Sequence, residues 1–291
     1  MPANSKSGAL ISLAVAMLSF QAGASIAKGL FPQVGAPGTT ALRLGLAVLI
    51  VGVLQRPWRA WPSRAAWPLI LGYGVALGTM NFTFYMAIRT IPLGVAVALE
   101  FTGPLTVALL HSRRRTDFLW VALAAVGTFF LLPIAPHAAA LDPPGVAFAL
   151  TAGVCWALYI VFGQKAGHVH GASTSAWGLT IAALVVVPIG VTMTGRTLLA
   201  PAVLMQGLGV AVLSSALPYT LEMAALRRLS ARTYGTLASL DPAAAALTGA
   251  IVLRERLDLG QWLAIAAVTV ASIGVVSGDP PPPDGPLPPF P

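Results

Sequence analysis

The segment at residues 259–276 reads LGQWLAIAAVTVASIGVV, and it is apolar on nearly every side. It is also long enough to cross the hydrocarbon core of a bilayer as a helix, which takes roughly 17–25 residues. The segment at residues 203–221, VLMQGLGVAVLSSALPYTL, has the same character. A strand of a membrane β-barrel would instead alternate apolar and polar residues in runs of about ten. Because a backbone in lipid must satisfy its own hydrogen bonds, both segments predict membrane-spanning helices.

The composition of the whole chain agrees with a membrane protein. Of its 291 residues, 57% are hydrophobic and only 9% are charged, and the mean hydropathy is +0.82. A soluble domain needs far more charged surface. The net charge is +8, but the basic residues stand in short connections and form no continuous basic face, so we expect no nucleic-acid partner. Cys155 is the single cysteine, which rules out an intramolecular disulfide.

Ten segments are apolar and have about the length of a membrane span. They cover residues 9–30, 39–54, 67–88, 91–110, 117–133, 145–163, 173–193, 203–226, 231–253 and 259–276. The predicted fold is therefore an all-α membrane protein with ten transmembrane helices. Residues 278–291 follow the last span and contain the run DPPPPDGPLPPFP, which predicts a disordered cytoplasmic tail because proline blocks helix formation.

Basic residues are distributed unevenly between the two sides of the predicted membrane domain. The loops on one side carry eleven Lys and Arg residues, and those on the other side carry five. The first set is Lys6, Arg56, Arg59, Arg64, Arg113, Arg114, Arg115, Lys165, Arg227, Arg228 and Arg232, and the second is Lys28, Arg89, Arg196, Arg254 and Arg256. Because cytoplasmic loops carry the excess of Lys and Arg, the first side and both termini are predicted to be cytoplasmic.

Short motifs recur in the same order in the two halves of the chain. Arg89 is followed by Pro104 after fifteen residues, and Arg227 is followed by Pro242 at the same spacing. This pattern predicts a duplication, with one five-helix repeat at residues 9–133 and a second at residues 145–276. Because each copy has an odd number of helices, the second enters the membrane upside down. Inverted repeats place a site near the midplane between the halves, which is typical of a transporter.

Three ionisable residues are predicted to lie at membrane depth, where a charged side chain costs at least about 2.5–3.5 kcal/mol. Glu100, midway along the fourth span, either exchanges a proton for a substrate ammonium group or is a protonated carboxyl bonded to a neighbouring helix. Arg43 either is a gate or an anchor for a substrate carboxylate, or extends to the outer headgroups. Asp241 either caps a half-helix that begins in the ninth span or contacts the substrate.

Helix breaks and polar stripes accompany these charges. Gly103 and Pro104 are predicted to loosen the fourth span just after Glu100, and Pro242 occupies the corresponding place in the ninth, because proline removes a backbone hydrogen bond. Polar residues also recur at helical spacing on single faces of several spans. Such stripes either line a substrate path or mediate helix–helix contacts. The predicted lining residues are Gln21, Ser25, Asn81, Tyr85, Trp156, Tyr159 and Ser215.

The chain resembles the EamA family of the drug/metabolite transporter superfamily in several segments. These are residues 23–28 (GASIAK), 35–44 (GAPGTTALRL), 92–105 (PLGVAVALEFTGPL), 155–157 (CWA) and 215–219 (SALPY). The segment that contains Glu100 is the most specific of them. Two positions differ from the family, because Asp241 precedes Pro242 where the family more often has Glu, and Arg254 precedes Glu255 where the family typically has Gly.

This resemblance implies a ten-helix inverted-repeat fold in the bacterial cytoplasmic (inner) membrane and efflux of threonine, homoserine or related amino acids, driven by a proton gradient. We therefore expect a secondary exporter whose partners are a small amino-acid substrate, protons and the lipid bilayer, without a cofactor or a metal. An enzyme is not expected, because no two histidines fall at metal-ligand spacing within a span and no nucleophile motif is present. The alternatives are a same-fold exporter of another small metabolite or drug, and a non-transporting membrane scaffold or sensor.

Overall fold

A computed structural model describes residues 6–111, 117–131, 141–170, 173–218, 221 and 239–278. Every regular element in these ranges is a helix. The α-helices are α1 (Lys6–Lys28), α2 (Phe31–Gln55), α3 (Trp67–Ile88), α4 (Leu93–Glu100), α5 (Thr102–His111), α6 (Asp117–Leu131), α7 (Pro143–His170), α8 (Thr174–Thr194), α9 (Pro201–Ala211), α12 (Asp241–Val252) and α13 (Leu259–Gly278). The short elements are the 3₁₀ turns η1 (Pro57–Arg59) and η3 (Gly195–Leu199) and the π-helical turn η4 (Val212–Ala216).

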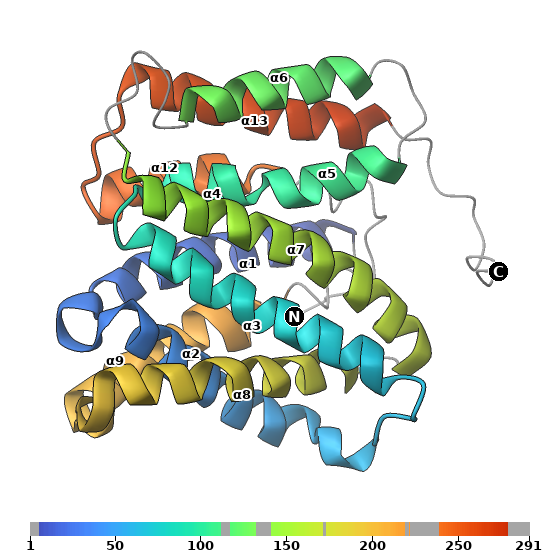
Figure 1. Cartoon of the computed structure of the whole chain (residues 1–291), viewed down its shortest axis with the longest axis vertical. Coiled ribbons are helices and arrows are strands. Elements are labelled where there is room, and N and C mark those ends of the chain that lie inside the picture. Colours follow the sequence, from blue (N-terminus) through green and yellow to red (C-terminus); the bar gives the residue numbers. More distant parts are fainter. Residues whose placement is uncertain are drawn as a thin grey trace.

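The helices form one bundle in which the two halves of the chain interleave (Figure 1). In that view α6 and α13 lie together at the top, and α2, α8 and α9 lie at the bottom. The main packing pairs are α3 with α7, α2 with α8, α6 with α13, and α4 with α12. Each pair joins a helix that precedes residue 141 to one that follows it. The centre of the bundle is therefore built from both halves.

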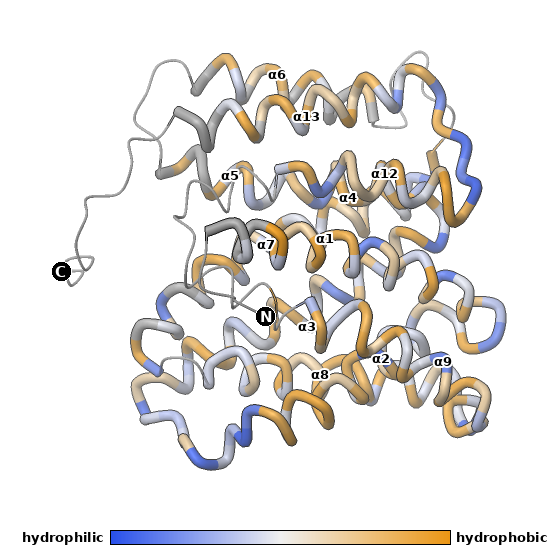
Figure 2. Tube along the Cα trace, turned by 180° about the vertical axis from the view of Figure 1, so that it is seen from behind, coloured by the Kyte–Doolittle hydropathy of each residue, from blue (hydrophilic) through white to orange (hydrophobic). Residues whose placement is uncertain are grey.

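The outer surface of the bundle is apolar, as the lipid environment requires. Large apolar side chains such as Leu49 and Ile251 are exposed on it, and Figure 2 shows hydrophobic residues along most of each helix. Among the described residues, five helices are long and apolar enough to cross a membrane, and several shorter apolar helices accompany them. The five are Ile11–Lys28, Phe31–Gln55, Trp67–Ile88, Pro143–Gly167 and Thr174–Leu199. The chain is therefore a multi-pass membrane protein.

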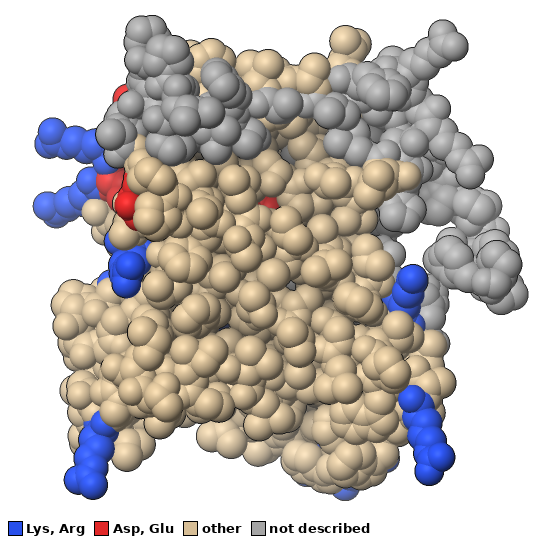
Figure 3. Space-filling model, viewed as in Figure 1, with Lys and Arg blue, Asp and Glu red and all other residues tan. Residues whose placement is uncertain are grey.

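Charged and aromatic residues mark the two ends of the bundle. Figure 3 shows Lys and Arg side chains projecting at opposite ends of one face, with an uncharged band over most of the area between them. Next to η1, the rings of Trp61, Trp67 and Trp177 form a cluster, with centroids 4.8 Å apart for Trp61 and Trp177. The Trp177 indole N–H donates to the Ala60 carbonyl at 3.1 Å. Tryptophan is enriched where a membrane meets water. The cluster lies beside the 3₁₀ turn that contains Arg59, which is consistent with such a boundary.

The helices differ from the expected spans at several boundaries. The second span was expected to begin at residue 39, but α2 begins at Phe31 and continues through a kink at Gly35, whose φ of 68° a glycine adopts easily. Arg43 consequently lies near the middle of α2 and not close to its end. The expected fourth span is divided into α4 and α5, and α7 extends beyond residue 163 to His170. Most of the expected ninth span and the proline-rich tail lie outside the described residues.

Candidate functional site

The break between α4 and α5 determines where Glu100 lies. Glu100 is the last residue of α4, and α5 begins two residues later at Thr102. Pro104 has no N–H, so it cannot donate to the Glu100 carbonyl four residues earlier. The Thr102 hydroxyl instead donates to the Leu99 carbonyl at 2.6 Å, which satisfies one acceptor at the break. The carboxyl group of Glu100 therefore projects from a helix end inside the bundle.

Two glycines allow α7 to lie directly against this break. A side chain at Gly103 would collide with the carbonyl group of Gly153 on α7, and a Cβ atom at Gly153 would lie 2.8 Å from the Glu100 carbonyl oxygen. One turn further along α7, the Trp156 ring packs edge-on against Phe101, with centroids 5.6 Å apart and an interplanar angle of 89°. The backbone contact between α5 and α7 thus sets Trp156 beside Glu100.

Arg43 is held inside the bundle by three groups from α3 and η4. Its side chain is only 4% exposed. Nε donates to the Ser215 hydroxyl of η4 at 2.9 Å, and Nη2 donates to the Asn81 side-chain oxygen of α3 at 2.5 Å. The guanidinium carbon also lies 5.1 Å from the centroid of the Tyr85 ring, which is a cation–π distance. The alternative in which Arg43 extends to the headgroups is therefore wrong.

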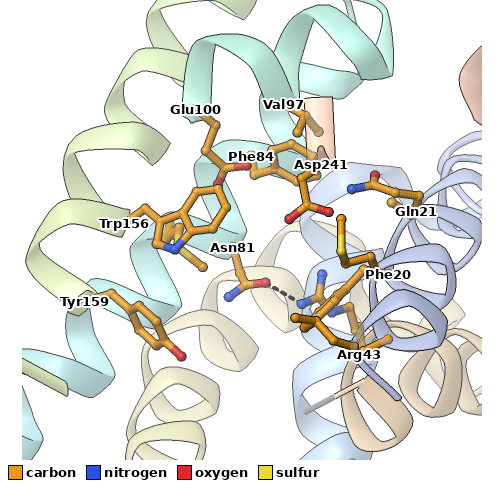
Figure 4. Close-up of a pocket in the computed structure, with 15 residues that line it drawn as sticks. Phe20, Gln21, Arg43, Asn81, Phe84, Val97, Glu100, Trp156, Tyr159 and Asp241 are labelled. Atoms are coloured by element: carbon orange, nitrogen blue, oxygen red, sulfur yellow. Dashed lines mark hydrogen bonds between the residues drawn. The ribbon is translucent and has the colours of Figure 1, made fainter. Parts of the chain in front are cut away.

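A cavity of about 150 Å³ lies between these groups. Figure 4 shows the Glu100 and Asp241 carboxyl groups and the Arg43 guanidinium directed into it from three different helices. The wall comprises Leu13, Ala16, Met17, Phe20, Gln21 and Ala24 of α1, Arg43 of α2, Met80, Asn81 and Phe84 of α3, Val97 and Glu100 of α4, Trp156 and Tyr159 of α7, and Asp241 of α12. Two acidic groups and one basic group thus share a small, largely apolar space.

Glu100 and Gln21 are polar residues on this wall whose side chains form no hydrogen bond with a described residue. Glu100 is 7% exposed and Gln21 is 6% exposed. Within the described part of the chain, no hydrogen bond reaches the carboxyl group of Glu100 or the amide of Gln21. Buried polar groups nearly always have a hydrogen-bond partner, and these two side chains face the cavity. Both side chains therefore indicate a binding site.

Asp241 lies one residue further into its helix than a capping role requires. The N-cap position of α12 is Leu240, and Asp241 and Pro242 form the first turn. The expectation that Asp241 is the N-cap is therefore wrong. A carboxylate in the first turn is nevertheless favoured, because the helix dipole places partial positive charge there. Figure 4 shows that the Asp241 carboxyl points into the cavity, between Glu100 and Arg43.

The remaining predicted lining residues divide into three groups. Asn81, Trp156 and Tyr159 line the cavity, whereas Tyr85 and Ser215 lie behind it and position Arg43. Ser25 is buried away from the wall, and its hydroxyl has no hydrogen-bond partner among the described residues. These residues are contributed by helices of both halves of the chain.

The apolar part of the wall and one supporting tyrosine are absent from the predicted set. Tyr73 stacks on Tyr159 with ring centroids 4.8 Å apart and hydroxyl oxygens 3.4 Å apart. Met17 precedes Gln21 by one helical turn, and Phe84 follows Asn81 by one turn, so helical spacing from the polar residues could have found both. No comparable signal in the sequence points to Tyr73. Among the described residues, no group of three His, Cys, Asp or Glu side chains could hold a metal ion.

An apolar helix bundle with a buried, charged cavity assembled from both halves of the chain is typical of a membrane transporter. Residues 143–277 match the EamA-like transporter family. The chain is 54% identical over 265 residues to the threonine/homoserine exporter RhtA of Escherichia coli strain K12, covering 91% of this chain and 90% of that protein. The corresponding protein of Salmonella typhimurium strain SL1344 is 53% identical over the same coverage.

More distant matches give the same picture. An uncharacterized transporter of Bacillus subtilis strain 168, YwfM, is 27% identical over 83% of this chain and 86% of its own. A crystal structure with 18% sequence identity superimposes with a TM-score of 0.60 and covers 93% of this chain and 96% of that one, which supports the fold alone. The chain belongs to the EamA-like transporter family. The prediction of a transporter of this family is therefore confirmed.

Proposed function

We propose that this protein exports threonine, homoserine and related small neutral amino acids from the cytoplasm across the bacterial inner membrane, in exchange for protons. The observation that carries the proposal is the convergence of Glu100, Asp241 and Arg43 on one buried cavity. The Escherichia coli and Salmonella relatives are named as exporters of threonine and homoserine, which supports this substrate class.

The charges on the cavity wall match a zwitterionic amino acid. The guanidinium of Arg43 presents a planar set of donors that suits a carboxylate, and Asn81 and Ser215 already fix its orientation. Glu100 and Asp241 supply the negative charge that an ammonium group requires. We therefore place the substrate carboxylate at Arg43 and the substrate ammonium group between the two acidic residues.

The size of the cavity favours a small substrate over a drug. Pockets for drug-sized ligands enclose about 300–1,000 Å³. A dry cavity of about 150 Å³ in another protein holds benzene, and the cavity here has a volume of about 150 Å³. An amino acid with a short side chain is only slightly larger than benzene. A modest movement of Met17 or Phe84 on the cavity wall would accommodate it.

Two carboxyl groups that face one buried space provide a basis for proton exchange. Glu100 and Asp241 face the same cavity, and two carboxylates that share one space repel one another when both are ionised. A proton on Glu100 relieves this repulsion, and so does the ammonium group of a bound substrate. Proton and substrate therefore compete for the same carboxyl group, so the release of one favours the binding of the other.

We also propose two inverted five-helix repeats, at residues 9–133 and 145–276, as the device that exposes the cavity to each side in turn. The packing of the described helices supports this organisation. The predicted repeats equate α1 with α7, α2 with α8, α3 with α9 and η4, α4 with α12, and α6 with α13. The pairs α2–α8, α4–α12 and α6–α13 each join a helix to its own counterpart. The counterpart of the pair α3–α7 is the pair formed by α9/η4 and α1, and both pairs are in contact. The clusters of basic residues and tryptophan beside η1 support a cytoplasmic location for that end.

The test is efflux from proteoliposomes loaded with radiolabelled threonine or homoserine, with and without an imposed pH gradient. We expect substrate efflux to be faster when the imposed gradient drives protons into the proteoliposomes. We expect the efflux of a Glu100→Gln variant not to depend on the gradient. Asp142→Asn is the matched control, because Asp142 caps α7 away from the cavity by accepting from the Gly145 N–H at 3.1 Å. Flux that is independent of the gradient, or a Glu100→Gln variant that matches the wild type, contradicts proton exchange. Saturable binding without flux favours a scaffold or a sensor.

A further inference from the structure

Gln21 is a buried amide that points into the cavity without a partner. It lies on α1, and Figure 4 shows its side chain beside Asp241, across the cavity from Trp156 and Tyr159. It is 6% exposed, and no hydrogen bond reaches its amide within the described ranges. A glutamine in such a position offers one acceptor and two donors. Because the amide faces the cavity, a polar group of a ligand bound there can use both its donors and its acceptor.

The other neutral polar groups on the wall are already engaged or offer less. The Asn81 side-chain oxygen accepts from Arg43, and its nitrogen donates to the Leu77 carbonyl at 2.8 Å. The hydroxyl of Tyr159 lies 3.4 Å from that of Tyr73. The indole of Trp156 is a donor only. Of the neutral groups that line the described cavity, Gln21 alone combines a donor and an acceptor that no other described residue uses.

An amino acid bound as proposed leaves one part of its structure unassigned. Arg43 takes the carboxylate, and Glu100 with Asp241 takes the ammonium group, so the side chain of the substrate must face the rest of the wall. That wall is formed by apolar groups such as Met17 and Phe20 and by the amide of Gln21. A hydroxyl group both donates and accepts, and this is the pairing that the Gln21 amide lacks.

We propose that Gln21 determines specificity by binding the side-chain hydroxyl of the substrate, so that hydroxylated small amino acids are exported in preference to apolar amino acids of the same size. This inference rests on the proposed function. A site with a buried polar group discriminates against an analogue that leaves the group unpaired. For one neutral hydrogen bond we expect a preference of about five- to tenfold for threonine over 2-aminobutyrate, which is threonine without the hydroxyl.

The experiment measures competition between these two amino acids in reconstituted protein. Wild-type proteoliposomes export radiolabelled threonine in the presence of internal threonine or 2-aminobutyrate, and the two inhibition constants give the preference. The Gln21→Met variant keeps the length of the side chain but removes its hydrogen-bonding groups, and we expect its preference to fall to about one while 2-aminobutyrate flux persists. Gln33→Met is the matched control, because Gln33 is exposed and pairs with Gln206 on the surface.

The outcomes separate this inference from the proposed function. Equal inhibition by both amino acids in the wild type overturns the inference. This test needs no variant, so it can be made even if Gln21→Met fails to fold. An unchanged preference in folded Gln21→Met also overturns it. Loss of the preference in Gln21→Met with retention in Gln33→Met supports it. Absence of any amino-acid flux in the wild type contradicts the proposed function instead, whereas threonine flux without preference contradicts only the role of Gln21.

Discussion

Replacing Gly153 by alanine tests whether close backbone packing positions Glu100. The added Cβ atom would lie 2.8 Å from the Glu100 carbonyl oxygen and 3.4 Å from its carbonyl carbon. Ordinary contact begins at about 3.4 Å, so α7 and the end of α4 must separate by roughly 0.6 Å. Overpacking of this kind costs about 1–3 kcal/mol of stability. Because the displaced atoms belong to Glu100, the cavity must change shape as well.

The assay for Gly153→Ala combines thermal denaturation of the purified protein with threonine efflux from proteoliposomes. We expect denaturation at a temperature several degrees lower and a loss of flux in excess of the loss of folded protein. Gly209→Ala is the matched control, because nothing lies within 4 Å of a Cβ atom at Gly209 on α9. Alanine is the better helix former, so this control retains full stability. The packing argument is refuted if the two variants are equally stable and equally active.

Two further predictions concern the connection between α12 and α13. Arg254 has a φ of 55°, a left-handed conformation that costs a residue with a side chain about 1–2 kcal/mol. We therefore expect Arg254→Gly to raise the denaturation temperature and the control Arg256→Gly not to raise it. A lower denaturation temperature in both variants would contradict this prediction. Glu255 pairs with Lys28 at 2.5 Å, and Glu255→Gln lowers stability by about 1–3 kcal/mol. A double-mutant cycle with Lys28→Met measures the coupling, and strict additivity of the two losses would disprove the ion pair.

The sequence predicts the class of fold because lipid leaves few alternatives. Apolar segments of sufficient length can only be helices in a bilayer, and the segment at residues 259–276 is indeed the helix α13. Boundaries were less certain where glycine and proline are frequent. Residues 31–38 fell between two expected spans, but a single kink at Gly35 allows α2 to continue through them. Such a choice depends on packing against α8, which is not visible along the chain.

Individual charges in the site could be predicted, but their partners could not. Glu100, Arg43 and Asp241 are conspicuous because charge is costly in lipid, and all three line the cavity. The hydrogen bond from Arg43 to Ser215 joins residues that lie far apart in the sequence, so no local spacing reveals it. The contribution of Tyr73 was missed for the same reason, because its contact with Tyr159 arises only from the packing of α3 on α7.

The two hydrogen bonds of the Arg43 side chain reach both halves of the chain. One hydrogen bond goes to Asn81 in the first half of the chain and the other to Ser215 in the second half. Any rocking of one half past the other must stretch at least one of these bonds, and each charge-assisted bond resists with about 1.5–3 kcal/mol. An incoming carboxylate that engages the guanidinium compensates for a broken bond at the moment of breakage. A bound substrate carboxylate at Arg43 would therefore lower the free-energy cost of this movement.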